Sequence, residues 1–214
     1  MTKLNKKNPD NGKARDFARI ASDIFAPIYP VIAEQILVNT GIRTGVALDL
    51  GCGPGHLATA LAVASDLTVH ALDLSSDMIQ ICEKRIMENE ISGRVIPVQG
   101  DVSSIPFEDE TFDLVVSRGS WFFWDDLTLG LKEAYRVLKS RGIAYIGGGF
   151  GTAALKQQII RVMKERDPDF ENGMNKRIRS MSMERVIGAL TSAEIIDYTI
   201  INDESGFWVR MVHS

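Results

Sequence analysis

The chain has 214 residues, of which 45% are hydrophobic and 24% are charged, and its formal net charge is −4 at pH 7. These values are typical of a globular protein that buries a large core in one domain. Because acidic side chains outnumber basic ones, we expect no broad nucleic-acid-binding surface and no nucleic-acid partner.

The cysteines and the hydropathy predict where the protein resides. Cys52 and Cys82 form no Cys-x-x-Cys pair, which disfavours a disulfide framework and favours a reducing compartment. No apolar run approaches the roughly 18 residues of a membrane span. The N-terminal lysines are not followed by the apolar stretch of a signal peptide. We therefore expect a cytoplasmic protein without a membrane partner.

The N-terminal region is predicted to change from a tail to helices. Residues 1–12 are polar and contain Asn, Pro and Gly, which is typical of a flexible tail, and residues 13–214 are predicted to form a single domain. Within 13–40, apolar residues recur at helical spacing, and Pro27 and Pro30 are expected to break the pattern into two helices. We expect these helices to lie over the sheet edge or the functional site.

Apolar, β-branched runs alternate with helical patterns over the next hundred residues. Strands are predicted at 45–50, 68–73, 94–99, 112–117 and 142–147, and helices at 56–64, 76–89 and 127–138. Strands that alternate with crossover helices pair in parallel, with helices on both faces of the sheet. The predicted fold class is therefore α/β, with a mostly parallel sheet.

The last third of the chain has a different pattern. Helices are predicted at 152–166 and 182–192, separated by a polar stretch at about 167–179, so that residues 150–192 form a helical insertion or lid. The β-rich runs 195–202 and 206–212 are joined by three polar residues, which predicts an antiparallel hairpin at the sheet edge.

A glycine-rich loop follows the first predicted strand and is the strongest functional signal. Glycines at 51, 53 and 55 permit a close approach of the backbone to a ligand, at the point where a strand leads into a helix. The dinucleotide fingerprint requires a third glycine at position 56, where this chain has His56. Asp49 would repel a pyrophosphate but suits a ligand that carries an ammonium and a sulfonium. Both features disfavour NAD.

Acidic residues also end the second and third predicted strands. Asp73 is placed to accept hydrogen bonds from ribose hydroxyls, and Gly100, Asp101 and Val102 follow the third strand. One such acid is often only a helix cap. Because ligands of open parallel sheets bind beyond the carboxyl ends of the strands, acids on successive strands indicate one binding crevice.

Four segments resemble the successive motifs of class I S-adenosylmethionine-dependent methyltransferases. They read ALDLGCGPGHLATALA, HALDLSSDMIQICEKR, VQGDVSSIPFEDETFDLVVS and LKEAYRVLKSRGIAYIGG. These motifs are most similar to those of the small-molecule branch related to ubiquinone and menaquinone biosynthesis (type 11). The resemblance covers about residues 45–150. It implies a Rossmann-like seven-stranded sheet with a reversed final strand, which agrees with the predicted hairpin.

The resemblance also implies roles for individual residues toward S-adenosylmethionine. Asp49 and the glycine loop would line the methionine part, Asp73 would hold the ribose, and Asp101 would bond the adenine amino group. The complete predicted cofactor set is Asp49, Gly51, Cys52, Gly53, Gly55, Asp73, Leu74, Met78, Gly100, Asp101, Val102, Ser117, Arg118 and Phe122.

The acceptor side is less defined by the sequence. The candidates near the transferred methyl group are Tyr29, Arg118, Trp121 and Trp124. Where the family often has two histidines, this chain has Phe122 and Phe123, which indicates an apolar wall without a proton-handling role. The glycines at 147–149 permit either close approach to a ligand or a hinge to the insertion. No general base and no metal site are identified.

Three functions remain open at this point. The first is methyl transfer to a small molecule by in-line displacement, at O, N, C or S. The second is a non-catalytic protein that binds S-adenosylmethionine as a regulatory subunit. The third is an NAD-dependent oxidoreductase, which the glycine spacing and Asp49 disfavour.

Overall fold

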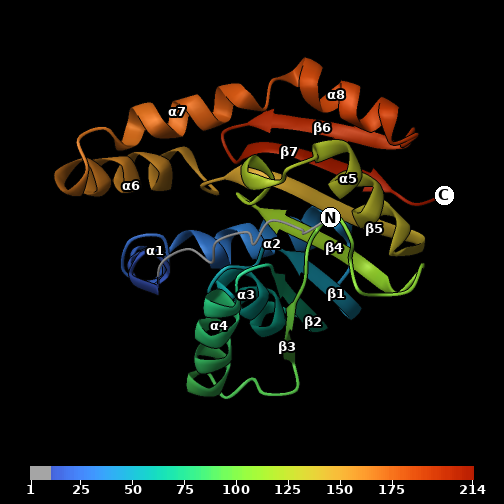
Figure 1. The fold of residues 1–214 in the computed structure, drawn as a ribbon, viewed down its shortest axis with the longest axis horizontal. Helices are drawn as coiled ribbons and strands as arrows, with labels where there is room; N and C mark the ends of the chain where they lie inside the picture. The colour runs from blue at the N-terminus through green and yellow to red at the C-terminus, as the bar shows by residue number, and fades with distance from the viewer. Residues whose placement is uncertain (1–10) are drawn as a thin grey trace, which may run out of the picture.

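The computed structural model describes residues 11–214 and contains one sheet of seven strands in the order β3-β2-β1-β4-β5-β7-β6 (Figure 1). The parallel strands are β1 (Thr44–Leu50), β2 (Asp66–Asp73), β3 (Val95–Gln99), β4 (Phe112–Arg118) and β5 (Leu138–Gly149). The antiparallel hairpin of β6 (Tyr198–Asp203) and β7 (Gly206–Val212) completes the sheet, with β7 paired to β5. The predicted fold class is confirmed.

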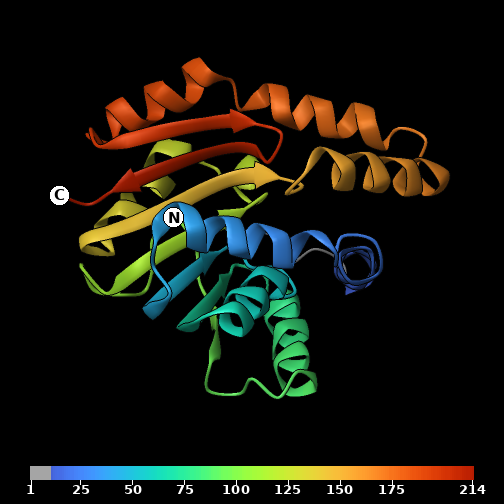
Figure 2. The same cartoon turned by 180° about the vertical axis from the view of Figure 1, so that it is seen from behind.

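Helices cover both faces of the sheet (Figures 1 and 2). One apolar cluster contains residues of α2 (Ile28–Thr40), α3 (His56–Ala64), α4 (Ser76–Glu88) and α6 (Ala153–Arg166), packed against alternate residues of the central strands. The other cluster contains residues of α5 (Leu127–Arg136) and α8 (Met183–Ser192), together with the short 3₁₀ helix η1 (Trp121–Phe123). The alternation along β4 places Leu114 and Val116 in the first cluster and Val115 in the second.

Several local predictions need correction. Helix α1 (Asn11–Asp23) already includes residues 11 and 12, which were assigned to the tail; residues 1–10 lie outside the described part of the chain. The predicted break into two helices is present between α1 and α2 and contains Pro27. Pro30 does not contribute to the break, because it lies in the first turn of α2, where a backbone N–H would have no partner within the helix. The polar stretch at 167–179 contains helix α7 (Phe170–Ser180), of which Met174 alone is fully buried.

Helices α6 and α7 extend together beyond the end of the sheet, above α1 (Figure 1). Helix α8 behaves differently from them, because its buried Val186 and Leu190 pack in the second cluster against the sheet. The segment from 150 to 192 thus contains a projecting pair of helices and one helix of the core.

The glycines at the end of β5 have a packing function. A Cβ at Gly147 would lie 2.2 Å from the carbonyl oxygen of Phe207, and one at Gly149 would lie 1.9 Å from that of Ser205. These glycines therefore permit the close approach of the neighbouring strand β7, which is neither of the two alternatives expected for them.

Candidate functional site

The glycine loop joins β1 to α3 in a conformation that requires glycine. Gly51, Gly53 and Gly55 have φ values of +65°, +53° and +78°. A Cβ at Gly51 would lie 2.4 Å from the Cβ of Ser120, and one at Gly55 would lie 2.4 Å from the sulfur of Cys82. At Gly53 the nearest atom is an edge carbon of Phe17, at 3.6 Å. Packing within the protein thus requires glycine at 51 and 55, whereas Gly53 faces more open space.

Asp49 lies behind this loop and has an incomplete set of partners. The residue is 2% exposed, and its Oδ2 atom has no hydrogen-bond partner among the described residues. Burial raises the pKa of the Asp49 carboxyl to about 8, and repulsion from Asp73 adds to this effect, although a backbone hydrogen bond from Ala58 opposes it. A cationic ligand group beside Asp49 would favour its ionised form.

Asp73 holds the glycine loop to the end of β2. Its Oδ2 accepts a hydrogen bond from the Gly53 N–H at 2.8 Å, and its Oδ1 accepts one from the Ser75 N–H at 2.9 Å. The carboxylate retains further lone pairs that face away from these donors. Burial raises the pKa of Asp73, while the two backbone N–H groups oppose the shift. The predicted ribose ligand is therefore also a structural link between the two strand ends.

The third strand end is joined to the second through the backbone. The Gly100 N–H donates to the Asp73 carbonyl at 3.0 Å. Asp101 accepts hydrogen bonds at Oδ1 from both the backbone N–H and the hydroxyl of Ser103, at 2.9 and 2.7 Å. The acids predicted for this edge therefore lie at or just beyond the carboxyl ends of the neighbouring parallel strands β1, β2 and β3.

A serine network connects the end of β4 to the end of β1. The hydroxyls of Ser117 and Ser120 are 2.6 Å apart, and each lies 2.9 Å from the Leu50 carbonyl oxygen. The Trp124 indole N–H donates to the Ser120 hydroxyl at 3.0 Å. Ser120 therefore supports the loop directly beneath Gly51, a role that its surroundings in the sequence do not indicate.

Arg118 lies on the opposite face of β4 from Ser117, among aromatic rings. Its Nε and Nη2 atoms donate to the Gly149 carbonyl at 3.1 and 2.9 Å. Its guanidinium carbon lies 5.5 to 5.7 Å from the ring centroids of Phe25, Tyr29 and Phe150. Burial lowers the pKa of Arg118, while Tyr29, through its charge and a side-chain hydrogen bond, opposes the shift. We call Arg118 and these three rings the arginine cage.

Helices α1 and α2 cover the glycine loop through polar contacts. The Arg85 side chain donates to the Pro54 carbonyl at 2.9 Å and to the Ser22 hydroxyl at 2.8 Å. That hydroxyl lies 3.3 Å from Nε2 of His56, whose ring stacks on Tyr29 with 4.7 Å between centroids. Burial, together with the nearby Arg85 and Arg118, lowers the pKa of His56 to about 3. The imidazole is therefore neutral at ordinary pH.

The remaining predicted cofactor residues occupy different surroundings. Cys52 is buried, and its hydrogen bond with Cys82, together with burial, raises the pKa of its thiol. Leu74 is half exposed, whereas Met78 lies in the first turns of α4, where its N–H is capped by Ser75. Val102 and Phe122 are partly buried and pack against the second apolar cluster.

The aromatic run from 121 to 124 is divided between core and surface. Trp121 and Trp124 are buried in the second cluster, and the Trp124 ring packs on Gly130. Phe123 is 72% exposed. Of the acceptor candidates, Tyr29 and Arg118 therefore lie together in the arginine cage, and the two tryptophans lie in the core of the opposite face.

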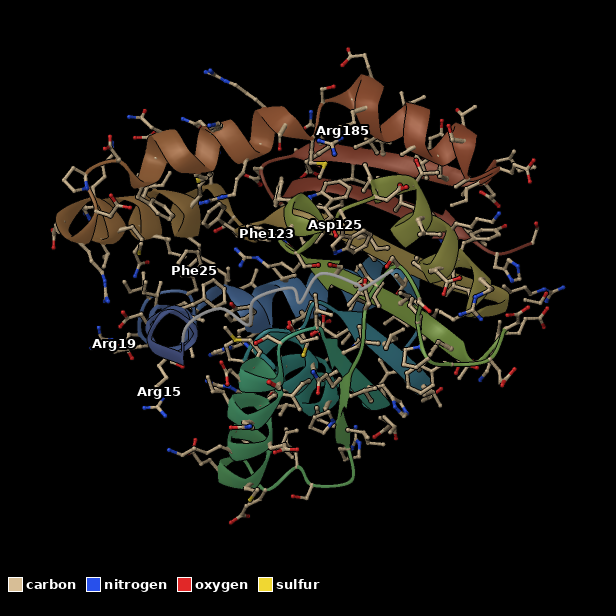
Figure 3. The ribbon with its side chains drawn as sticks, viewed as in Figure 1. Arg15, Arg19, Phe25, Phe123, Asp125 and Arg185 are labelled. Carbon is tan, nitrogen blue, oxygen red and sulfur yellow. The ribbon has the colours of Figure 1, made fainter. Side chains whose placement is uncertain are left out.

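Sequence reasoning missed several residues of this region. Ser22, Arg85 and Ser120 were not selected, because serine and arginine on polar helix faces or in loops have no distinctive spacing. Phe170, at the start of α7, also reaches the region and lies 6.3 Å from Phe25, centroid to centroid. Figure 3 shows Phe25 between α1, which carries Arg15 and Arg19, and the projecting α6 and α7.

Known proteins share both the motifs and the architecture. The profile of the methyltransferase domain family matches residues 48–146. The uncharacterized methyltransferase YdaC of Bacillus subtilis is 30% identical over 129 residues, which are 59% of this chain and 69% of that protein. A crystal structure of a protein proposed to be an S-adenosyl-L-methionine-dependent methyltransferase, from Methanococcus maripaludis, is 42% identical with a TM-score of 0.93, over 100% of this chain and 97% of its own. The chain belongs to the S-adenosylmethionine-dependent methyltransferases.

This methyltransferase is also 32% identical over 133 residues to the demethylmenaquinone methyltransferase of Staphylococcus aureus. That match covers 61% of this chain and 54% of the relative, so the chain spans about half the length of that enzyme. The predicted activity and cofactor are confirmed: the protein is a methyltransferase that uses S-adenosylmethionine. The resemblance to the type 11 branch is also confirmed.

Two further properties concern residues 11–214. In this part of the methyltransferase, no single helix has the length and apolarity to cross a membrane, although the bent pair 15–23 and 28–40 passes that test together on length and composition. Within the same residues, no group of His, Cys, Asp or Glu side chains is arranged to hold a metal ion.

Proposed function

We propose that the methyltransferase binds S-adenosylmethionine along the carboxyl ends of β1, β2 and β3, and that it methylates a small molecule enclosed between α1–α2 and α6–α7. The bound cofactor supplies an electrophilic methyl group on a sulfonium. The proposal assigns to the glycine loop and its acids the binding of this donor, and to the neighbouring aromatic side chains the enclosure of the acceptor.

The unpaired carboxylate oxygen of Asp49 is the observation that supports this proposal most strongly. A buried polar atom without a partner is costly, so it indicates that a ligand completes its surroundings. The methionyl ammonium of the cofactor has the charge and the donors that Asp49 lacks. Gly53, beside it, leaves space for the backbone to approach such a ligand. The residues present thus fit the cofactor.

The roles of the other predicted residues follow from their positions. We propose that Asp73 accepts hydrogen bonds from the ribose while it holds the Gly53 N–H, and that Asp101 and Val102 contact the adenine. Leu74 and Met78 would line the same edge. Five further members of the predicted set would maintain the backbone geometry of this edge rather than contact the donor chemically: Gly51, Cys52, Gly55, Gly100 and Ser117.

Methyl transfer mainly requires that the enzyme align the two reactants and exclude water. In-line displacement at a methyl group gains most from the correct orientation of two bound reactants. Phe25, Phe150 and Phe170 supply apolar surface at the position where the two helical segments meet. His56 is a poor general base, since a group whose pKa is about 3 takes up few protons near neutral pH. The acceptor would therefore be nucleophilic without its help.

We also propose that residues 13–214 act as one domain in which part of the insertion at 150–192 serves as a lid. The projecting α6 and α7 would cover the acceptor, whereas α8 remains packed on the sheet. Contacts between Phe25 and the rings of Phe150 and Phe170 support this assignment, because they join the insertion to the N-terminal helices.

Calorimetry with S-adenosylhomocysteine and NADH tests the binding half of the proposal. We expect S-adenosylhomocysteine to bind and NADH not to bind. Asp49→Asn should weaken S-adenosylhomocysteine binding at least tenfold. Asp66→Asn is the matched control, because Asp66 is an exposed carboxylate at the opposite end of β2, and it should not change the affinity. Tight NADH binding would contradict the proposed site, and so would an equal affinity of Asp49→Asn and Asp66→Asn for S-adenosylhomocysteine.

Turnover tests the catalytic half. The enzyme is incubated with S-adenosylmethionine and the small-molecule fraction of a cell extract, and S-adenosylhomocysteine is quantified. We expect product that depends on the extract and disappears with Asp49→Asn. Binding without product in any metabolite fraction would instead support a regulatory subunit that binds the cofactor without catalysis.

A further inference from the structure

Arg118 is a desolvated cation without an acidic partner. Within residues 11–214, no carboxylate forms an ion pair with it, and its hydrogen bonds go to the Gly149 carbonyl and the Tyr29 side chain. The other cation of this region, Arg85, is likewise bound to a carbonyl and a hydroxyl. A buried charge is stabilised mainly by an opposite charge, and aromatic faces replace only a small part of its lost hydration. The arginine cage therefore has an excess of positive charge.

The guanidinium also has spare hydrogen-bonding capacity. Arginine carries five N–H donors in a planar fork that matches the two oxygens of a carboxylate. One carbonyl and one phenol use only part of these donors. The rings of Phe25, Tyr29 and Phe150 fix the guanidinium in place, so that a ligand would meet a preorganised fork.

From these observations, and on the basis of the proposed function, we propose that Arg118 and Tyr29 form a binding site for a ligand carboxylate, such as that of an amino acid group. The Tyr29 hydroxyl is hydrogen-bonded to Arg118, and it also lies within the electrostatic influence of the Asp49 carboxyl and the Arg85 guanidinium. An α-amino acid carries a carboxylate and an ammonium on one carbon, which matches a site that has both a cation and an acid near one phenol.

This carboxylate has two sources. One is the methionyl end of the cofactor, in which case Arg118 and Asp49 bind the two charges of the same group. The other is a carboxylate on the methyl acceptor, in which case Arg118 selects the substrate. Both sources share the chemistry of the site, and they differ in which ligand loses affinity when Arg118 is replaced.

Calorimetry separates the cofactor source. S-adenosylhomocysteine and 5′-methylthioadenosine share the adenosine and the sulfur, but only the first has the amino acid group. If the cofactor supplies the carboxylate, Arg118→Met should weaken the binding of S-adenosylhomocysteine at least tenfold and leave the affinity for 5′-methylthioadenosine unchanged. Arg161→Met is the matched control, because Arg161 is an exposed arginine on α6, and it should change neither affinity.

Thermal denaturation tests the acceptor source in enzyme saturated with S-adenosylhomocysteine. If the acceptor supplies the carboxylate, benzoate should raise the Tm of the wild type, benzamide should not, and Arg118→Met should abolish the shift with unchanged S-adenosylhomocysteine affinity. The inference is overturned when Arg118→Met alters neither S-adenosylhomocysteine binding nor a benzoate-specific shift. A wild type that binds neither adenosine ligand contradicts the proposed function itself.

Two milder variants apply if Arg118→Met loses its cooperative thermal transition. Tyr29→Phe keeps the ring of the cage and removes the hydroxyl, and it should lower the affinity for the carboxylate ligand several-fold. Arg118→Lys keeps the charge without the fork and should have an intermediate effect. If both variants bind every probe as the wild type does, Arg118 is a structural residue of the cage.

Discussion

The carboxyl edge of β1, β2 and β3 and the arginine cage are adjacent but are built in different ways. The edge is held by backbone hydrogen bonds: the Gly53 N–H donates to Asp73, and the Cys52 and Gly100 N–H groups donate to carbonyls of β2. The cage is held by side chains from segments far apart in the chain, including Phe25 before α2 and Phe150 after β5.

This difference predicts how each region responds to change. A site made from backbone donors tolerates few substitutions, because a Cβ in the wrong place moves the donors themselves. A site made from rings and a cation keeps its backbone when a side chain changes. We therefore expect the edge to serve one fixed ligand, and the cage and its surroundings to set which acceptor is accepted.

The largest expected effect is on the edge. Gly53→Val should abolish S-adenosylhomocysteine binding, because a β-branched residue at a φ of +53° is strained and its side chain enters the open space beside Phe17. Calorimetry measures the binding and circular dichroism confirms the fold. Gly173→Val is a control for the glycine-to-valine change, since a Cβ at Gly173 on α7 meets no atom within 4 Å. Retained binding in Gly53→Val would show that the loop is only structural.

The second effect separates the buried and the exposed members of the aromatic run from 121 to 124. Trp121→Ala should destabilise the protein by about 3–5 kcal/mol, because a fully buried indole leaves a cavity, whereas Phe123→Ala should stay within about 0.5 kcal/mol. Urea denaturation measures both values. Similar costs for the two variants would mean that Phe123 is covered in solution.

The edge was largely predictable from the sequence because its residues are close in the chain. Asp49 and the glycines lie within one strand-to-helix connection, and Asp73 and Asp101 each end a recognisable strand. Local spacing therefore specified which residues meet. It did not specify that Asp73 binds the Gly53 N–H, since a hydrogen bond between two loops depends on how the strands pair.

The cage was only partly predictable for the opposite reason. Tyr29 and Arg118 were selected as separate candidates, but 89 positions of sequence numbering separate them, and no pattern indicates that Arg118 stacks on the Tyr29 ring. Trp121 and Trp124 looked equally suitable because composition does not reveal which face of the sheet a loop aromatic covers. Helix α7 was missed because its composition is polar on average, although Phe170, Met174 and Ile178 recur at helical spacing.

A smaller effect is expected at the link between two strand ends. Asp73→Ala should weaken the binding of S-adenosylhomocysteine by about 1–3 kcal/mol, because the ribose and the Gly53 N–H both lose an ionised acceptor. Asp73→Asn should lose less, since the amide oxygen still accepts one hydrogen bond. Calorimetry with both variants and with Asp66→Ala as control measures the difference. Equal affinity of Asp73→Ala and wild type would remove Asp73 from the site.

The smallest expected effect is the pH dependence of the edge. Because the pKa of Asp49 in the free protein is raised to about 8, S-adenosylhomocysteine should bind about tenfold more tightly at pH 8.5 than at pH 7, as the ionised carboxylate becomes available for the ammonium. Binding at pH 7 should also release a proton, which calorimetry in buffers of different ionisation enthalpy detects. In Asp49→Asn both effects should be absent.

The same shift has a consequence for folding that distinguishes Asp49 from the cage. An aspartate has an unfolded pKa of about 3.9, so the folded protein binds the Asp49 proton more tightly than the unfolded chain does. The resulting stabilisation is complete below about pH 4 and is lost as the pH rises toward 8. The free enzyme should therefore lose stability over this range more steeply than Asp49→Asn, as urea denaturation at several pH values would measure. His56 contributes a slope of the opposite sign between about pH 3 and 6.5, because its folded pKa of about 3 lies below its unfolded value of about 6.5. Asp49→Asn retains His56, so the difference in slope between the two proteins reports Asp49. A slope that persists unchanged in Asp49→Asn would place the buried proton on another group and would weaken the case for Asp49 as the partner of the ammonium.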